Sequence, residues 1–181
     1  MRAIFVLLLL TPLVAFSTTA ALPEAKMKSW PMPILNKMLA MLKDQVDHVQ
    51  AQLDTLKQKV MSIDDPKQIS PAIAKDMEDI INLILDVANA GVEIAVGVLD
   101  IIGRDIPSGV LALVKAGIEI FGDIVHMIED GLDMLQHILN LGGSSELQKQ
   151  MENMISSMKN AENKLQAQID KIQQKIDYPG K

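Results

Sequence analysis

The chain lacks cysteine altogether and is poor in aromatic residues, with one tryptophan, one tyrosine and three phenylalanines among its 181 residues. Without cysteine it can form no disulfide, thiolate metal site or thiol nucleophile, so packing alone must hold the fold together. The scarcity of flat rings argues against a sugar or nucleobase site. The core must instead be aliphatic, with the eleven methionines that follow Met1 as its adaptable filler.

Catalytic signatures are also missing from the chain. The sequence has no nucleophile elbow, phosphate-binding glycine loop or zinc-protease motif, so we expect a non-enzymatic protein without a cofactor. The formal net charge is −6, and an acidic surface attracts neither nucleic acid nor anionic membranes. No Asn-x-Ser/Thr sequon occurs, so N-glycosylation is not expected.

The first twenty residues have the layout of a secretory signal peptide. Arg2 precedes an apolar run that ends at Phe16, and small residues follow. We predict a signal peptide over residues 1–20, cleaved after Ala20 or Ala21, and therefore a secreted, extracellular protein. A retained N-terminal anchor is the alternative, but the apolar run is short for a membrane span.

The remaining chain, residues 21–181, is predicted to form a single helical domain. Ser70 is placed to cap the start of one helix and Gly103 to cap its end. Ser145 and Gln148 form a capping-box pattern before the last helical segment. Periodicity and these signals together predict four helices, over about residues 34–62, 71–102, 107–141 and 145–177.

The first and last of these helices carry narrow apolar seams with spacings of three and four residues, the heptad pattern of helices that pack on long partners. The first seam consists of Leu35, Leu39, Leu42, Val46, Val49, Leu53, Leu56 and Val60. The last consists of Met151, Met154, Met158, Ala161, Leu165, Ile169, Ile172 and Ile176. We predict an all-α fold of four long helices in an up-down antiparallel bundle, with an apolar central hairpin flanked by two amphipathic, coiled-coil-like helices.

The two central helices are apolar over most of their circumference, and their polar residues fall within about 80° of arc. The polar stripe comprises Asp79, Asp86, Glu93 and Asp100 on one helix and Glu119, Asp123, Asp130 and Asp133 on the other. The candidate apolar face comprises Ile84, Val92, Ile94, Val98, Leu113, Ile118, Phe121 and Ile124. The two narrow seams are expected to leave part of this hairpin for a lipid, another apolar ligand or a second copy to cover.

The polar stripe is open to two interpretations. It is either a solvated edge that keeps an apolar helix soluble or, if several hairpins assembled in a bilayer, the lining of a cation-selective pore. His126 and His137 lie among its acids and are candidates for sensing pH near about 6 to 7. Because this is the only polar face of the helix, we expect it to point to water and predict no metal site.

These patterns leave three functional classes. We expect foremost a non-enzymatic helical protein that binds lipid, another hydrophobic ligand or a membrane surface through the central hairpin. The alternative is an oligomerising pore-forming or membrane-disrupting protein, although the helices offer no continuous uncharged span of about 20 residues for one chain to cross alone. A further alternative is a structural protein that forms a homo-oligomer or binds a protein partner.

Overall fold

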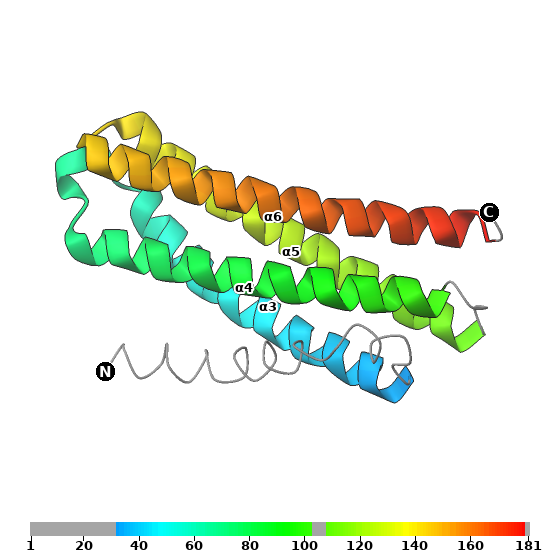
Figure 1. The fold of residues 1–181 in the computed structure, drawn as a ribbon. Helices are drawn as coiled ribbons and strands as arrows, with labels where there is room; N and C mark the ends of the chain where they lie inside the picture. Colours follow the sequence, from blue (N-terminus) through cyan, green and yellow to red (C-terminus); the bar gives the residue numbers. More distant parts are fainter. Residues whose placement is uncertain (1–31, 103–107, 180–181) are drawn as a thin grey trace.

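The computed structural model describes residues 32–102 and 108–179, and within these ranges it contains only helices and their connections. The signal peptide, its cleavage site and the Gly103 cap lie outside the described residues. The all-α fold is confirmed, and the predicted helix bounds differ from the observed ones by one or two residues at most. The elements are α3 (Met32–Met61), the 3-10 turn η1 (Pro66–Gln68), α4 (Pro71–Ile102), α5 (Ser108–Leu141) and α6 (Ser145–Asp177) (Figure 1).

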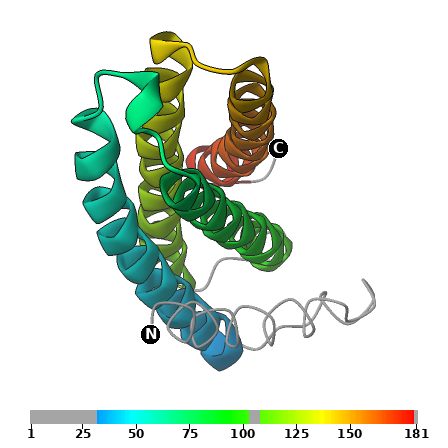
Figure 2. The ribbon, with the colours of Figure 1, turned by 90° about the vertical axis from the view of Figure 1, so that its left-hand side faces the viewer.

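Consecutive helices run in opposite directions, so that α3 and α5 point one way and α4 and α6 the other (Figure 1). The helices α4 and α5 contact each other, and each also contacts both outer helices. Seen from one end of the bundle, α3 and α6 lie on opposite sides of this central pair (Figure 2). The prediction that the two outer helices flank the α4–α5 hairpin is therefore confirmed. The contacts also join helices that run in the same direction, α3 with α5 and α4 with α6.

The start of α4 is capped as expected, but the cap of α6 is shifted by one residue. Ser70 Oγ accepts a hydrogen bond of 3.2 Å from the backbone N–H of Ile73. At α6 the N-cap is Ser144, whose Oγ accepts a 3.2 Å bond from the N–H of Leu147. The prediction of Ser145 was wrong because two adjacent serines suit this position equally well and the preceding chain decides between them.

That preceding chain is the link between α5 and α6. Gly142 and Gly143 end α5 with φ values of +85° and +107°, a region of backbone conformation that glycine enters without steric cost. They leave Ser144 in an extended conformation, with ψ of 150°. The helix consequently begins at Ser145, and Ser144 is free to cap it.

The seams of the outer helices form the two flanks of the core. All eight predicted seam residues of α3 are buried. In α6 the predicted seam is buried except for Met154 and Ile176, which are half-buried, and Ile155 is buried although it was not predicted. The buried residues of the described chain are all apolar, so the core is aliphatic apart from the ring of Phe121.

The outer helices cover more of the hairpin than was expected from the width of their seams. Among the described large apolar residues of α4 and α5, only Val96 is exposed, with 38% of its surface accessible. Each outer helix lies in the groove between α4 and α5 and so covers one flank of both. The large apolar residues of the described hairpin that the outer helices leave accessible are therefore limited to Val96 and to its half-buried edges.

Candidate functional site

The fold divides the predicted apolar face into a buried part and a half-buried part. Five of its members are fully buried in the core: Ile84, Ile94, Val98, Phe121 and Ile124. The other three are half-buried and pack against the core from its edges: Val92, Leu113 and Ile118. The surface that remains accessible therefore lies along the edges of the two central helices.

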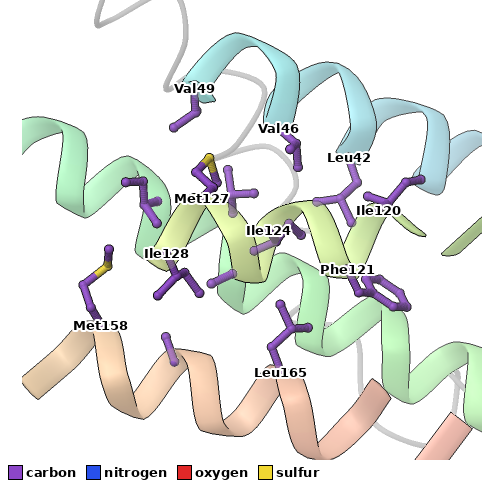
Figure 3. Close-up of a cluster of buried hydrophobic side chains, with 14 of the residues drawn as sticks. Leu42, Val46, Val49, Ile120, Phe121, Ile124, Met127, Ile128, Met158 and Leu165 are labelled. Atoms are coloured by element: carbon purple, nitrogen blue, oxygen red, sulfur yellow. The ribbon is translucent and has the colours of Figure 1, made fainter. Parts of the chain in front are cut away.

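The two edges of α5 differ in chemistry. Ile120 and Met127 lie toward α3, whereas Ile128 lies toward Met158 of α6 (Figure 3). Beyond these buried residues, each edge carries a row that repeats every seven residues. The row toward α3 is small or polar: Gly109, Ala116, Asp123, Asp130 and His137. The row toward α6 is aliphatic and half-buried: Leu111, Ile118, Val125, Leu132 and Leu139.

The edges of α4 also differ, but in the size and burial of their residues and not in polarity. A Cβ atom built on Gly131 of α5 would lie 2.6 Å from Met158 Cε, 3.4 Å from Ile84 Cδ1 and 3.5 Å from Ile81 Cδ1. Ile84 lies at the centre of the buried face of α4, and we therefore take Ile81, beside it, to mark the side of α4 that borders α6. The row beside it is half-buried and consists of Leu85, Val92 and Leu99. The corresponding row toward α3 is Leu83, Ala90 and Gly97. We call the eight half-buried residues that border α6 on α4 and α5 the α6-side rows.

Sequence reasoning found only two members of the α6-side rows, Val92 and Ile118. A usable signal was present, because Leu, Ile or Val recurs at every seventh position from Leu111 to Leu139. It was hidden by the apolar character of the rest of the helix. Only the packing of α6 shows that this row is an edge and not part of the core.

Polar side chains connect α3 to α5. Lys57 Nζ lies 2.8 Å from Asp130 Oδ1 and 3.6 Å from Asp133 Oδ2. The Nε2 group of Gln50 donates a 3.2 Å hydrogen bond to Asp130 Oδ2. We call these four residues the α3–α5 polar cluster. The sequence predicted the two acids as members of a solvated stripe, but it gave no sign of Gln50 and Lys57, which lie 80 and 73 residues away from Asp130 in the chain.

The cluster shifts the pKa values of its two central members. The hydrogen bond from Lys57 to Asp130, aided by the charges of both acids, raises the pKa of Lys57 above its ordinary value of 10.5. Partial burial alone would raise the pKa of Asp130, but the hydrogen bond and charge of Lys57 outweigh it, and the pKa lies below 3.8. Both groups are thus held in their charged forms.

The helix α6 has no comparable connection. Among the described residues, no side-chain hydrogen bond or ion pair joins α6 to another helix; the bond from Gln166 to Asp170, 2.9 Å long, stays within α6. The same holds for α4, where Lys75 pairs with Asp79 at 3.3 Å in its own helix. Between the described helices, apolar packing is therefore what joins Ser145–Asp177 to the hairpin.

The acidic stripe lies mostly at the surface. Five members are exposed: Asp86, Asp100, Glu119, Asp123 and Asp133. Asp79, Glu93 and Asp130 are half-buried. Partial burial raises the pKa of both Asp86 and Glu93 above their ordinary values, because desolvation disfavours the charged carboxylate.

The two candidate pH-sensing histidines have different surroundings. His126 is exposed, and its Nδ1 lies 3.2 Å from Glu129 Oε2 one helical turn away. His137 is half-buried, and its Nε2–H donates a 2.8 Å hydrogen bond to the carbonyl oxygen of Ile63, just beyond α3. In the described part of the chain, no three His, Asp or Glu side chains are close enough together to hold a metal ion.

Open grooves lie at the two ends of the bundle. One, of about 560 Å³, lies where α3 and α5 begin and is lined by Met32, Pro33, Asn36, Gly109, Ala112, Leu113 and Ala116. The other, of about 700 Å³, lies between the η1 region and the start of α6, with Ile69, Pro71 and Leu147 among its lining residues. Neither groove reaches the buried members of the apolar face, so access to them requires the helices to separate.

Comparison of the chain with protein-family models, with curated proteins and with solved structures finds no match in any of the three.

Proposed function

We propose that the chain is a secreted, non-enzymatic helical protein that binds lipid surfaces or other apolar ligands through its α4–α5 hairpin. The observation that carries this proposal is the pair of α6-side rows. Eight large aliphatic side chains, from Leu85 to Leu139, lie half-buried in two lines along the borders of one amphipathic helix. Such lines extend the apolar surface of the hairpin beyond what α6 covers.

The interior of the bundle suits an exchange of protein contacts for lipid contacts. The buried side chains of the described residues are all apolar, and the chain has no disulfide to hold its helices together. Separating helices in water exposes apolar area at a cost of about 25 cal/mol per Å². Acyl chains that replace the lost apolar contacts remove this cost.

The charge of the protein indicates which lipid headgroups it favours. The net charge is −6, and acids form the solvated edge of both central helices. An anionic membrane would repel this surface, whereas a zwitterionic one would not. We therefore expect binding to vesicles of phosphatidylcholine that weakens when anionic lipid is added.

A vesicle flotation assay on the mature protein tests the proposal, with Val92→Asp and Asn89→Asp as a matched pair. Both variants add one negative charge to α4, but Val92 belongs to the α6-side rows and Asn89 is exposed. Moving a carboxylate into hydrocarbon costs about 2 to 3 kcal/mol or more, so Val92→Asp should lose at least tenfold in affinity. Asn89→Asp should bind like the parent protein.

Three results would contradict the proposal in different ways. Equal binding by both variants would remove the hairpin edge as the contact surface. Failure of the parent protein to float with vesicles would remove lipid-surface binding itself. Protein that remains lipid-free as a discrete oligomer would support the self-associating alternative. Circular dichroism of each variant ensures that the loss of binding does not come from unfolding.

A membrane pore is the second candidate, favoured by one observation. Among the described helices, α4 alone is long and apolar enough to cross a membrane, although most of that stretch is buried within the bundle. Asp86 and Glu93 would then line the pore. Replacing both with lysine should invert the cation preference of any conductance, and an unchanged preference in active protein would exclude this lining.

A further inference from the structure

We infer that α6 is the helix that leaves the hairpin, and that the surface it uncovers takes up the acyl chains of zwitterionic phospholipid while α3 stays in place. The inference rests on the proposed function and adds to it which side of the hairpin binds and which element controls access. It follows from a difference between the two outer helices, which have similar lengths and seams but are attached by different forces.

The attachment of α3 is partly polar. The α3–α5 polar cluster joins the two helices by the 2.8 Å contact of Lys57 with Asp130 and the 3.2 Å bond from Gln50. A second connection follows just beyond α3, where His137 donates to the carbonyl of Ile63 at 2.8 Å. An acyl chain can replace an apolar contact but not the partners of these groups, so separating α3 from α5 costs the ion pair and the hydrogen bonds in addition to the apolar packing.

Among the described helices, the contacts that attach α6 to the hairpin are ones that lipid can replace. Its buried seam is entirely apolar, and no side-chain hydrogen bond or ion pair joins it to the other described helices. Methionines 151 and 158 contribute unbranched, flexible side chains to this seam, and such side chains repack readily against partners of different shape. Gly142 and Gly143 keep α6 joined to α5 through a backbone conformation that glycine tolerates.

The surface beneath α6 fits acyl chains. Release of α6 would add its buried floor to the α6-side rows and join them into one continuous face. The floor consists of Ile81, Ala88 and Ala95 on α4 and of Val114, Phe121, Ile128 and Leu135 on α5. No residue of the rows or the floor bears a charge, whereas the edge toward α3 carries Asp123, Asp130 and His137. The released α6 is itself amphipathic and can lie on the same lipid surface.

Hydrogen exchange of the full mature protein, followed by mass spectrometry, tests the inference with and without phosphatidylcholine vesicles. Without lipid, the amides of α6 should exchange through an opening that leaves α3 protected. With vesicles, the amides of α3 should keep their protection. Loss of protection in α3 together with α6, or before it, would overturn the inference.

A matched pair of leucine variants provides a second measurement. Leu165 in α6 and Leu53 in α3 are both fully buried, and Leu→Ala removes the same atoms from each. Weaker docking of α6 raises the population of the open form, so Leu165→Ala should raise the vesicle-bound fraction at limiting lipid by about fivefold or more. Leu53→Ala should change it less than about twofold. Equal effects, or a larger effect of Leu53→Ala, would overturn the inference.

Two further readouts keep the inference distinguishable from the proposed function. If Leu165→Ala fails to fold, Leu165→Val and Leu53→Val make the same comparison with a smaller loss of packing.

If the parent protein binds no vesicles, the proposed function fails. The order in which the amides of α3 and α6 exchange in the absence of lipid then decides the role of α6. An α6 that opens before α3 supports that role, and an α6 that opens with α3 or after it refutes it.

Discussion

Asp86 and Glu93 belong to the solvated edge of α4 but have lost part of their contact with water. Burial raises the pKa of each carboxyl in the folded protein, so the folded state binds a proton more readily than the unfolded one. Stability should therefore increase as the pH falls from the raised pKa values toward the ordinary ones of 3.8 and 4.5. At neutral pH the two charges are a small cost to the fold.

The double variant Asp86→Asn, Glu93→Gln should be slightly more stable than the parent at pH 7. Because both carboxyls remain in contact with water, we expect a gain of about 0.5 kcal/mol at most. Chemical denaturation at pH 7 and at pH 4 measures it, and the gain should shrink at the lower pH. A gain that grows on acidification would contradict the assignment of burial as the cause.

Lys57 and Asp130 differ from these acids because the fold stabilises both of them in their charged forms. The pKa of Asp130 is lowered, so its contribution to stability is present above 3.8 and is lost as the pH falls below that value. The pKa of Lys57 is raised, so its contribution is present below 10.5 and is lost as the pH rises through the raised pKa. The pair should stabilise the fold across the whole range between these limits.

Lys57→Met should reduce the free energy of unfolding by about 1 kcal/mol at pH 7, because it leaves the half-buried Asp130 without its cation. Lys43→Met is the control, since the pair of Lys43 with Asp47, at 3.5 Å, has both side chains more than half exposed. It should have almost no effect. Denaturation curves that show equal losses would mean that the polar cluster adds nothing to the apolar packing of α3.

At the scale of single elements, local signals were enough to place the helices. The seam of α3 was predicted completely because its apolar residues repeat at helical spacing against a polar background. The central helices gave a weaker signal. They are apolar on nearly every side, so periodicity located their polar stripe but not the division between core and edge. That division depends on where α6 lies.

The N-cap of α6 is a local feature with a direct test. Ser144→Ala should destabilise the protein by about 1 kcal/mol, because the N–H of Leu147 loses its acceptor. Ser145→Ala removes the same hydroxyl from the first residue of α6 and should have a much smaller effect. Thermal denaturation of the two variants compares them. The reverse order would assign the cap to Ser145.

At the scale of the whole molecule, the order of the helices around the core was beyond sequence reasoning. A heptad seam shows that a helix packs against a partner. It does not identify the partner, nor the side of the α4–α5 hairpin on which the helix lies. The residues that settle this point for α3, Lys57 and Asp130, are 73 positions apart. Each of them alone is an ordinary surface charge. The same limit hid the α6-side rows, which become edges only after α3 and α6 have been placed on opposite sides.

The aliphatic core also determines how movements of this protein can be observed. Phe121 is the one aromatic residue in the described core, and Tyr178, at the end of α6, is largely exposed. Phenylalanine absorbs and emits weakly, so the described core contributes little intrinsic fluorescence with which to follow the departure of α6. Positions 91 and 117 are glycines, and a Cβ there would lie 3.9 and 3.6 Å from the ring of Phe121. A tryptophan at position 121 would place a fluorophore at the floor beneath α6 and make its release visible in real time.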